Sequence, residues 1–307
     1  MTPPTSTTET LDRELEQLEP ERDGRVAPAE RPERRSDRVT VIQPATGWLR
    51  LDLGELWTYR ELAGTFAWRD FKVRYKQTFV GIFWALIQPF GQMIVAVVIF
   101  GKFAKFPSDG PYPLFTYSGL LLWGYFQGSI TRASNALVGN VSFVTKIYFP
   151  RVLLPLSSVI SPLVDFMFAS VILVLLMIKY KSPPGPEVIA SPFFLLLAMM
   201  TAFGVGMSLA SINVRYRDVP YTLPYLLQIW TLLSPVYYSA NHLPQKWQWI
   251  FALNPMTGVL GGWRWSLGGA PFPPTSQLVT SIFTALGTLI FGLILFRRQE
   301  PRFADNI

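Results

Sequence analysis

Few side chains in the apolar part of the chain could carry out covalent chemistry. The sequence has one histidine, His242, and no cysteine, which excludes disulfides and Cys/His zinc sites and leaves little for a nucleophile–base pair. Asp165 is the single charge in the run 152–178, so paired carboxylates for acid–base work are absent there. No phosphate-binding loop, nucleophile elbow or metalloprotease motif occurs. We therefore expect a chain that is no enzyme and has no catalytic, metal-binding or cofactor-binding residues.

Asp165 admits two interpretations. An aspartate at the centre of a bilayer costs about 2.5–3.5 kcal/mol on insertion scales, so its side chain should face other helices or a partner. The first interpretation is a structural hydrogen bond to a serine such as Ser158, Ser161 or Ser170. The second is a role in transport.

The composition predicts an all-α membrane protein. Half of the residues are hydrophobic and only 15% are charged, whereas soluble domains carry about 25% charged residues. A membrane span needs about 20 mostly apolar residues. The run 247–263 is shorter and contains Asn254-Pro255 and three glycines, which favours a re-entrant or interfacial segment over a span. Six transmembrane helices are expected, near residues 79–101, 113–131, 153–178, 190–213, 220–240 and 274–296.

Charge divides the chain into parts. Residues 1–47 have a net charge of −3 and many prolines, which predicts a disordered N-terminal tail, solvated or with a docking role. We expect an interface helix in 48–78, the six-helix transmembrane domain in 79–298 and a short C-terminus in 299–307. With a cytoplasmic N-terminus, cytoplasmic flanks carry roughly twice as many Lys and Arg residues as outer ones, which places both termini inside. The positive charge is thus an orientation signal and no indication of nucleic-acid binding.

The segment 56–76 is neither apolar enough to span nor polar enough to be a linker. At helical spacing, Arg69, Lys72 and Lys76 gather on one side. This pattern predicts an amphipathic helix in the headgroup layer, bound to membrane lipids and placed either as a plain anchor or in contact with a cytoplasmic partner. The opposite side is apolar and aromatic: Tyr59, Leu62, Ala63, Phe66, Ala67, Phe71 and Tyr75.

Several spaced motifs resemble one family. The run from Arg69 to Pro89, RDFKVRYKQTFVGIFWALIQP, resembles the signature of polysaccharide-export permeases, the membrane subunits of type 2 ABC transporters for O-antigen, capsule, teichoic acid and related glycans. The resemblance covers about residues 50–298 and does not extend to the tail. Further matches are Phe149-Pro150-Arg151, Leu154-Pro155, Val164-Asp165-Phe166, Asn213 to Asp218 and Asn254-Pro255-Met256-Thr257.

The resemblance implies partners and sites. It implies a homodimer of permeases working with two copies of a separate ATPase, which binds ATP and Mg. It implies extracellular re-entrant helices between spans five and six, which suits 243–269, and a coupling helix within 140–151. Against a coupling role, the cations could be the orientation signal alone, and Arg217 and Asp218 could be a local surface pair. The candidate ATPase-coupling residues are Lys146, Tyr148, Arg151, Arg215, Arg217 and Asp218.

Aromatic residues are candidates for a glycan path. Rings stack on sugar faces without fixing one hydroxyl pattern, so a polymer held by them can slide. The competing interpretation is an aromatic belt at each membrane interface. The resemblance favours spans one and five, which contain Phe83, Trp84, Tyr225, Trp230, Tyr237 and Tyr238.

The leading hypothesis is therefore a permease of an ATP-driven exporter of a lipid-linked polysaccharide in the cytoplasmic membrane. Two alternatives remain: the same fold exporting a drug or small amphiphile, and an energy-independent flippase or scaffold of an envelope assembly complex. A membrane glycosyltransferase is the weakest alternative, because no loop carries the clustered acids that would bind a metal and a sugar nucleotide.

Overall fold

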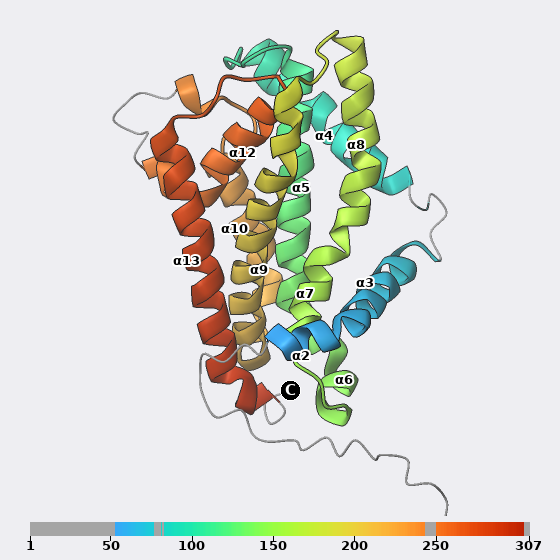
Figure 1. Cartoon of the computed structure of the whole chain (residues 1–307). Helices are drawn as coiled ribbons and strands as arrows, with labels where there is room; N and C mark the ends of the chain where they lie inside the picture. The colour runs from blue at the N-terminus through green and yellow to red at the C-terminus, as the bar shows by residue number, and fades with distance from the viewer. Residues whose placement is uncertain (1–52, 77–80, 82, 243–249, 304–307) are drawn as a thin grey trace, which may run out of the picture. The chain divides into compact units, whose positions relative to one another are not determined.

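The computed structural model describes residues 53–76, 81, 83–242 and 250–303, all within one compact unit, and no strand occurs among them (Figure 1). The tail 1–47 and the segment 243–249 lie outside the described residues. The helices are α2 (Leu53–Thr58), α3 (Arg60–Tyr75), α4 (Phe83–Ala96), α5 (Tyr112–Asn135), α6 (Val141–Lys146), α7 (Leu153–Ile160), α8 (Pro162–Lys179), α9 (Ser191–Arg215), α10 (Val219–Leu233), α12 (Pro255–Ser266) and α13 (Thr275–Gln299), with a π-helix η1 (Val97–Phe103) and short 3-10 turns η2 (Val138–Asn140), η3 (Pro186–Ala190), η4 (Ala240–His242) and η5 (Glu300–Arg302).

Four helical stretches among the described residues are long and apolar enough to cross a membrane. They are Phe83–Phe103, Leu153–Lys179, Pro186–Arg215 and Thr275–Arg302, and they coincide with the predicted spans one, three, four and six. The stretch Leu153–Lys179, which is the predicted span three, consists of α7 and α8, which meet at Ser161-Pro162. Proline lacks an amide hydrogen and its ring crowds the preceding turn, which explains the interruption there.

The predicted spans two and five differ from these four. Span two corresponds to α5, which has 24 residues but includes Gly, Ser, Thr and Gln, and most of its residues are buried by neighbouring helices. Span five was expected to reach residue 240, but α10 has 15 residues and ends at Leu233. The chain is extended at Ser234 because the following Pro235 disfavours a helical residue before it. At 1.5 Å per residue, α10 is only about 22 Å long.

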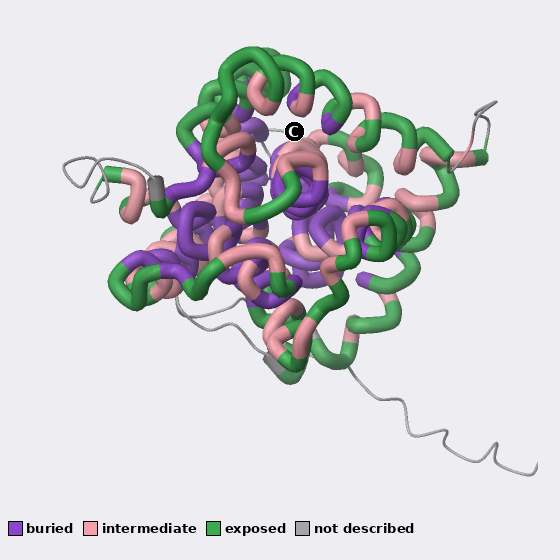
Figure 2. The backbone as a smooth tube through the Cα atoms, turned by 90° about the horizontal axis from the view of Figure 1, so that it is seen from above, coloured by how far each residue is buried: buried purple, intermediate pink, exposed green. Residues whose placement is uncertain are grey.

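Helices α5 and α9 pack at the centre of the bundle, and α13 packs against α9 at its edge (Figure 1). Seen from above, buried residues lie in the middle and exposed residues around them (Figure 2). The contact between α9 and α13 is close because Gly204 faces Gly292, and a Cβ added at Gly292 would overlap the backbone of Gly204. The glycines of α9 thus permit close helix packing. Asn213 joins α9 to α5 by donating to the Ser134 carbonyl at 2.9 Å.

Helix α12 is fixed at one end of the bundle, which we call the α12 end. Asn254 caps its first turn, since its side-chain oxygen accepts from the Met256 amide at 3.0 Å, and Pro255 occupies the first helical position. The buried Arg264 donates to the carbonyls of Phe115, Pro235 and Val236 and lies 3.7 Å from the Phe115 ring centroid. This one side chain therefore holds α12, α5 and the extended residues after α10 together.

The opposite end, the α6 end, contains α2, α3, α6, the start of α7 and the last turns of α9 and α13. The apolar side predicted for the amphipathic helix packs here on the protein itself, because Ala63, Phe66 and Ala67 of α3 are buried. Large apolar side chains remain exposed on α2 and α3 outside that side: Trp57, Trp68 and Val73. The short helix α6 lies inside the segment predicted to contain a coupling helix.

Candidate functional site

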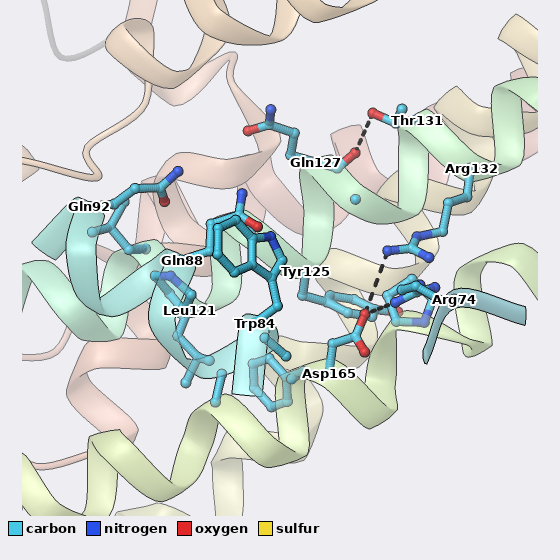
Figure 3. A pocket seen from close by; sticks show the side chains of 18 of the residues that line it. Arg74, Trp84, Gln88, Gln92, Leu121, Tyr125, Gln127, Thr131, Arg132 and Asp165 are labelled. Carbon is cyan, nitrogen blue, oxygen red and sulfur yellow. Dashed lines mark hydrogen bonds and ion pairs between the residues drawn. The ribbon is translucent and has the colours of Figure 1, made fainter. Parts of the chain in front are cut away.

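A cavity of about 780 Å³ lies among the end of α3, α4, α5 and α8. Figure 3 shows side chains from all four helices around it. The cavity opens to the surface, since Trp84, Gln88, Gln92 and Gly124 in its lining are exposed. Its deeper wall is apolar and aromatic, with Leu120, Leu121, Tyr125, Phe166 and Ala169.

Helix α4 presents a polar and aromatic row to this cavity. Trp84, Gln88 and Gln92 are spaced by four residues, so they follow one another along one side of the helix. Gln88 and Gln92 form no side-chain hydrogen bond with any residue in the described ranges. Amides that offer donors and acceptors beside an indole ring suit a ligand with hydroxyl edges and apolar faces.

An ion cluster lies at the mouth of the cavity. The Asp165 carboxylate is paired with Arg74, lies 3.5 Å from the Arg132 guanidinium and accepts a 2.5 Å hydrogen bond from the Tyr75 hydroxyl (Figure 3). Burial lowers the pKa of Arg74 below its ordinary value, an effect that its hydrogen bond with Tyr75 partly offsets. Three helices, α3, α5 and α8, thus contribute to one charged group at the boundary of an apolar wall.

The main contacts of Asp165 are therefore Arg74, Arg132 and Tyr75, and not the serine hydroxyl groups of the first interpretation. The Ser170 hydroxyl donates to the Phe166 carbonyl of its own helix, and the Ser161 hydroxyl is 3.4 Å from Arg74. The sequence could not reveal this, because Arg74 is 91 residues away and was assigned to a membrane-surface helix.

A second cavity of about 570 Å³ continues toward the α6 end. It shares Thr131 and Arg132 with the first, so Arg132 lies between the two. Arg69 lines the second cavity, donates to Asp70 at 2.9 Å and to the Asn140 side chain at 2.7 Å, and lies over the rings of Phe66 and Phe143.

The three predicted interface cations are therefore not equivalent. Arg69 joins α3 to the loop before α6, whereas Lys72 and Lys76 are exposed on the same helix. Only the two lysines are thus placed as a lipid-facing pair would be.

The predicted coupling residues lie at the α6 end, with different surroundings. Lys146 and Tyr148 are exposed, and the Tyr148 side chain is 61% accessible. Arg151 is half-buried and donates to the Glu300 carbonyl at 2.5 Å, so it contacts the chain's own C-terminal region. The other three residues are exposed at the end of α9 and directly after it: Arg215, Arg217 and Asp218.

The predicted path aromatics do not form one group. Trp84 lines the large cavity, and Phe83 beside it is 63% exposed. Trp230 packs edge-on against Trp123 and Phe126 and donates to Asn254, so it belongs to the core. Tyr225 is 66% exposed on α10. Tyr237 and Tyr238 line a separate cleft of about 440 Å³ near the α12 end, together with Phe100 and Phe106.

Several cavity residues were missed by sequence reasoning. Gln88 and Gln92 could have been found, because two amides at a spacing of four after Trp84 form a row in an apolar span. Tyr75, Tyr125 and Gln127 gave no such signal. Their place depends on how α3, α5 and α8 pack, which no local pattern encodes.

The chain is similar in sequence to several export proteins. The O-antigen export system permease of Myxococcus xanthus is 26% identical over 255 residues, which cover 82% of this chain and 98% of the relative. The polysialic acid transport protein of Escherichia coli is 23% identical over 240 residues, 76% of this chain and 91% of the relative. A capsule polysaccharide export inner-membrane protein of Neisseria meningitidis is 24% identical over 213 residues, 66% of this chain and 78% of the relative.

The model of one family matches residues 61–268, which include α3, α4, α5 and α8 with the whole ion cluster. The match extends over more than half of the chain. The chain therefore belongs to the ABC-2 type transporter family.

Proposed function

We propose that this chain is the membrane permease of an ATP-driven exporter that moves a lipid-linked cell-surface polysaccharide, an O-antigen or capsule-type glycan, across the inner membrane. The observation that carries the proposal is the similarity along almost the full length of a relative named as an O-antigen export permease. The open cavity supports it, because amides and rings on α4 suit hydroxyl-rich chains with apolar faces. As a member of this family the chain binds no cofactor itself, and ATP is handled by a separate ATPase.

The proposed topology has six spans and cytoplasmic ends. The stretches α4–η1, α5, α7–α8, α9, α10 and α13 are the spans, α12 is a re-entrant helix on the outer side, and the α6 end faces the cytoplasm. The exposed Lys72, Lys76, Lys146 and Arg215 at the α6 end support this orientation. We retain the division into a tail (1–47), an interface helix (48–78), a transmembrane domain (79–298) and a short C-terminus (299–307).

The ATPase contact is proposed on α6 and the exposed residues around it. Lys146 and Tyr148 extend from the protein there and have no partner role within the described fold. A movement of α6 would be transmitted to α3 through Arg69, because its guanidinium donates to the Asn140 side chain and lies over the Phe143 ring. Five residues further along α3, Arg74 reaches the cavity. Coupling therefore has a continuous physical route from α6 to the cavity.

A second copy of the chain is proposed as a partner, with two ATPase copies. Exposed apolar surface on α10 supports such an interface, including Tyr225 at 66% and Leu226 at 56% exposure.

Deletion of the gene tests the function. The expected result is loss of long-chain surface glycan, visible by gel staining of cell-envelope extracts, with the polymer accumulating inside the cell. Re-expression of the chain with its ATPase should restore the glycan, whereas an ATPase without ATP hydrolysis should not. Intact surface glycan together with raised drug sensitivity would instead indicate a drug exporter. Glycan movement without any ATPase would indicate a flippase or scaffold.

Coupling is tested by charge reversal of an exposed residue. Lys146→Glu should leave the amount of membrane-inserted permease unchanged while ATP hydrolysis no longer rises with substrate. Arg302→Glu, at an exposed cation after α13, is the matched control. Equal behaviour of the two variants would contradict the assignment of α6.

A further inference from the structure

The ion cluster at the mouth of the large cavity is more than a structural pair. Its two guanidinium groups, from Arg74 and Arg132, face a single carboxylate, Asp165, so the lining of the cavity has an excess of positive charge. Both arginine side chains remain partly accessible, at 22% and 35%. A partly buried ionic group of this kind contributes little to stability, because the cost of desolvation offsets the attraction.

The geometry of the cluster fits an anion with more oxygens than a carboxylate has. One Asp165 oxygen faces both arginines, and the other accepts from Tyr75. A phosphate ester offers further oxygens, and arginine's planar fork pairs with phosphate in a bidentate manner. Phosphate could therefore satisfy Arg132 and Arg74 better than the shared carboxylate does.

The neighbouring surface indicates that the phosphate belongs to a lipid. Next to the cavity row, α4 has an outward apolar side formed by Phe83, Ile87, Phe90 and Ile94, all at least 41% exposed. At 100° per residue these four lie within about 60° of one another and beside the row of Trp84, Gln88 and Gln92. A hydrocarbon chain along this side would bring its headgroup to the cavity mouth.

We propose that Arg132 and Arg74 bind the phosphate group through which the exported glycan is joined to its lipid, and that Asp165 occupies this site between substrates. The proposal rests on the proposed export function and adds the chemical group that the permease recognises. Arg132 lies between the two cavities, so it can contact a headgroup that arrives from the α6 end.

The replacement of Asp165 by phosphate as the partner of the two arginines would also act as a conformational switch. Asp165 on α8 holds Arg74 on α3 and Arg132 on α5, and a phosphate that takes both arginines breaks these two ion pairs, so that α8 stays joined to α3 at this site only by the Tyr75 hydrogen bond. Because α3 also reaches α6 through Arg69, the presence of substrate becomes detectable at the surface proposed for the ATPase.

Binding to the permease–ATPase complex in nanodiscs tests the proposal. The probes are a polyprenyl phosphate, the matching uncharged polyprenol, inorganic phosphate and vesicles of phosphatidylglycerol. The variants are Arg132→Gln, which removes a cation, Arg132→Lys, which keeps the charge without the fork, and Asp165→Asn, which removes the competing carboxylate. Lys179→Gln removes an exposed cation at the far end of α8 and serves as the control.

We expect Arg132→Gln to weaken polyprenyl phosphate binding about tenfold or more, the size of one charge-assisted hydrogen bond, with a smaller loss for Arg132→Lys. Asp165→Asn should tighten binding several-fold, a gain that a misfolded protein cannot produce. Polyprenol should bind all variants equally and weakly. Lys179→Gln should match the original chain.

Unchanged affinity in both Arg132→Gln and Asp165→Asn would overturn the proposal. Inorganic phosphate that competes as well as the lipid would overturn the lipid assignment, and phosphatidylglycerol that competes equally would overturn the substrate assignment. The export function is judged separately. If Arg132→Gln cells keep their surface glycan while deletion cells lose it, export stands and the phosphate site fails.

Discussion

The two halves of the helix bundle are built differently. Around α5, α9, α12 and α13, helices touch at glycines and a buried arginine closes the α12 end, so little space remains. Around α3, α4, α5 and α8, two connected cavities separate the helices, and α4 is largely exposed. We refer to these as the closed half and the open half.

The difference assigns separate tasks to the two halves. Close-packed backbone has few alternative arrangements, so the closed half can hold its geometry while other parts move. The open half contains the amides of Gln88 and Gln92, which have no side-chain hydrogen bond to another described residue, together with the shared carboxylate and the link to α6. Substitutions in the closed half should therefore change stability, and those in the open half should change transport.

Removing Arg264 should have the largest effect on stability. Arg264→Leu leaves the carbonyls of Phe115, Pro235 and Val236 without their shared donor, which we expect to lower the free energy of unfolding by roughly 3 kcal/mol or more. The apparent Tm of the purified protein in detergent measures the loss. A Tm equal to that of the original chain would show that the α12 end does not depend on this side chain.

Disrupting the glycine contact between α9 and α13 should have the second largest effect on stability. Gly292→Ala forces a methyl group into the Gly204 backbone, and overpacking of this kind costs about 1–3 kcal/mol. Gly287→Ala on the same helix has open space around its Cβ and should leave the Tm unchanged or higher. The comparison of the two Tm values isolates the effect of this contact. Equal values would show that α9 and α13 are not closely packed at Gly204 and Gly292.

Arg69→Gln should have a smaller effect on stability and a clear effect on coupling. The variant loses the bond to Asn140, for which we expect about 1 kcal/mol, because the side chain is partly exposed. The amount of glycan exported per ATP hydrolysed should fall. Arg60→Gln on the exposed first turn of α3 is the control, and the idea fails if both variants export equally.

The cavity amides should have the smallest effect on stability. The double variant Gln88→Ala and Gln92→Ala removes side chains with no protein partner among the described residues, so the free energy of unfolding should change by less than about 0.5 kcal/mol. Export should nevertheless fall several-fold, as measured by pulse-labelled glycan at the cell surface. Gln299→Ala, at the end of α13, controls for loss of an amide, and full export by the double variant would remove α4 from the path.

The sequence predicted the helical class and four of the spans because long apolar runs are a local signal. It overestimated the fifth span, since the apolar run continues past Ser234-Pro235 although the helix does not. The motif Asn254-Pro255 was predictable as a break, and its role as a helix cap follows from local chemistry. The elements were thus largely accessible from residue patterns.

The site was less predictable than the elements. Trp84 was singled out as an aromatic at the start of a span, and it does line the cavity. Trp230 was singled out as another aromatic of the path, but it packs in the core. The residue type alone does not distinguish an aromatic side chain that lines a cavity from one that packs in the core. The ion cluster joins residues about 90 positions apart, and only the tertiary packing of α3 on the bundle brings them together.

The ion cluster also imposes an order on biosynthesis. Both arginines precede Asp165 in the chain, so each is already synthesised when the carboxylate reaches the membrane. An unpaired aspartate at mid-membrane is costly, about 2.5–3.5 kcal/mol, and on the proposed topology the third span inserts where its counter-ions are waiting. On that topology, α3 and α5 are in place to compensate Asp165 when α8 inserts, and a nascent chain that lacked them would deliver an uncompensated charge to the bilayer.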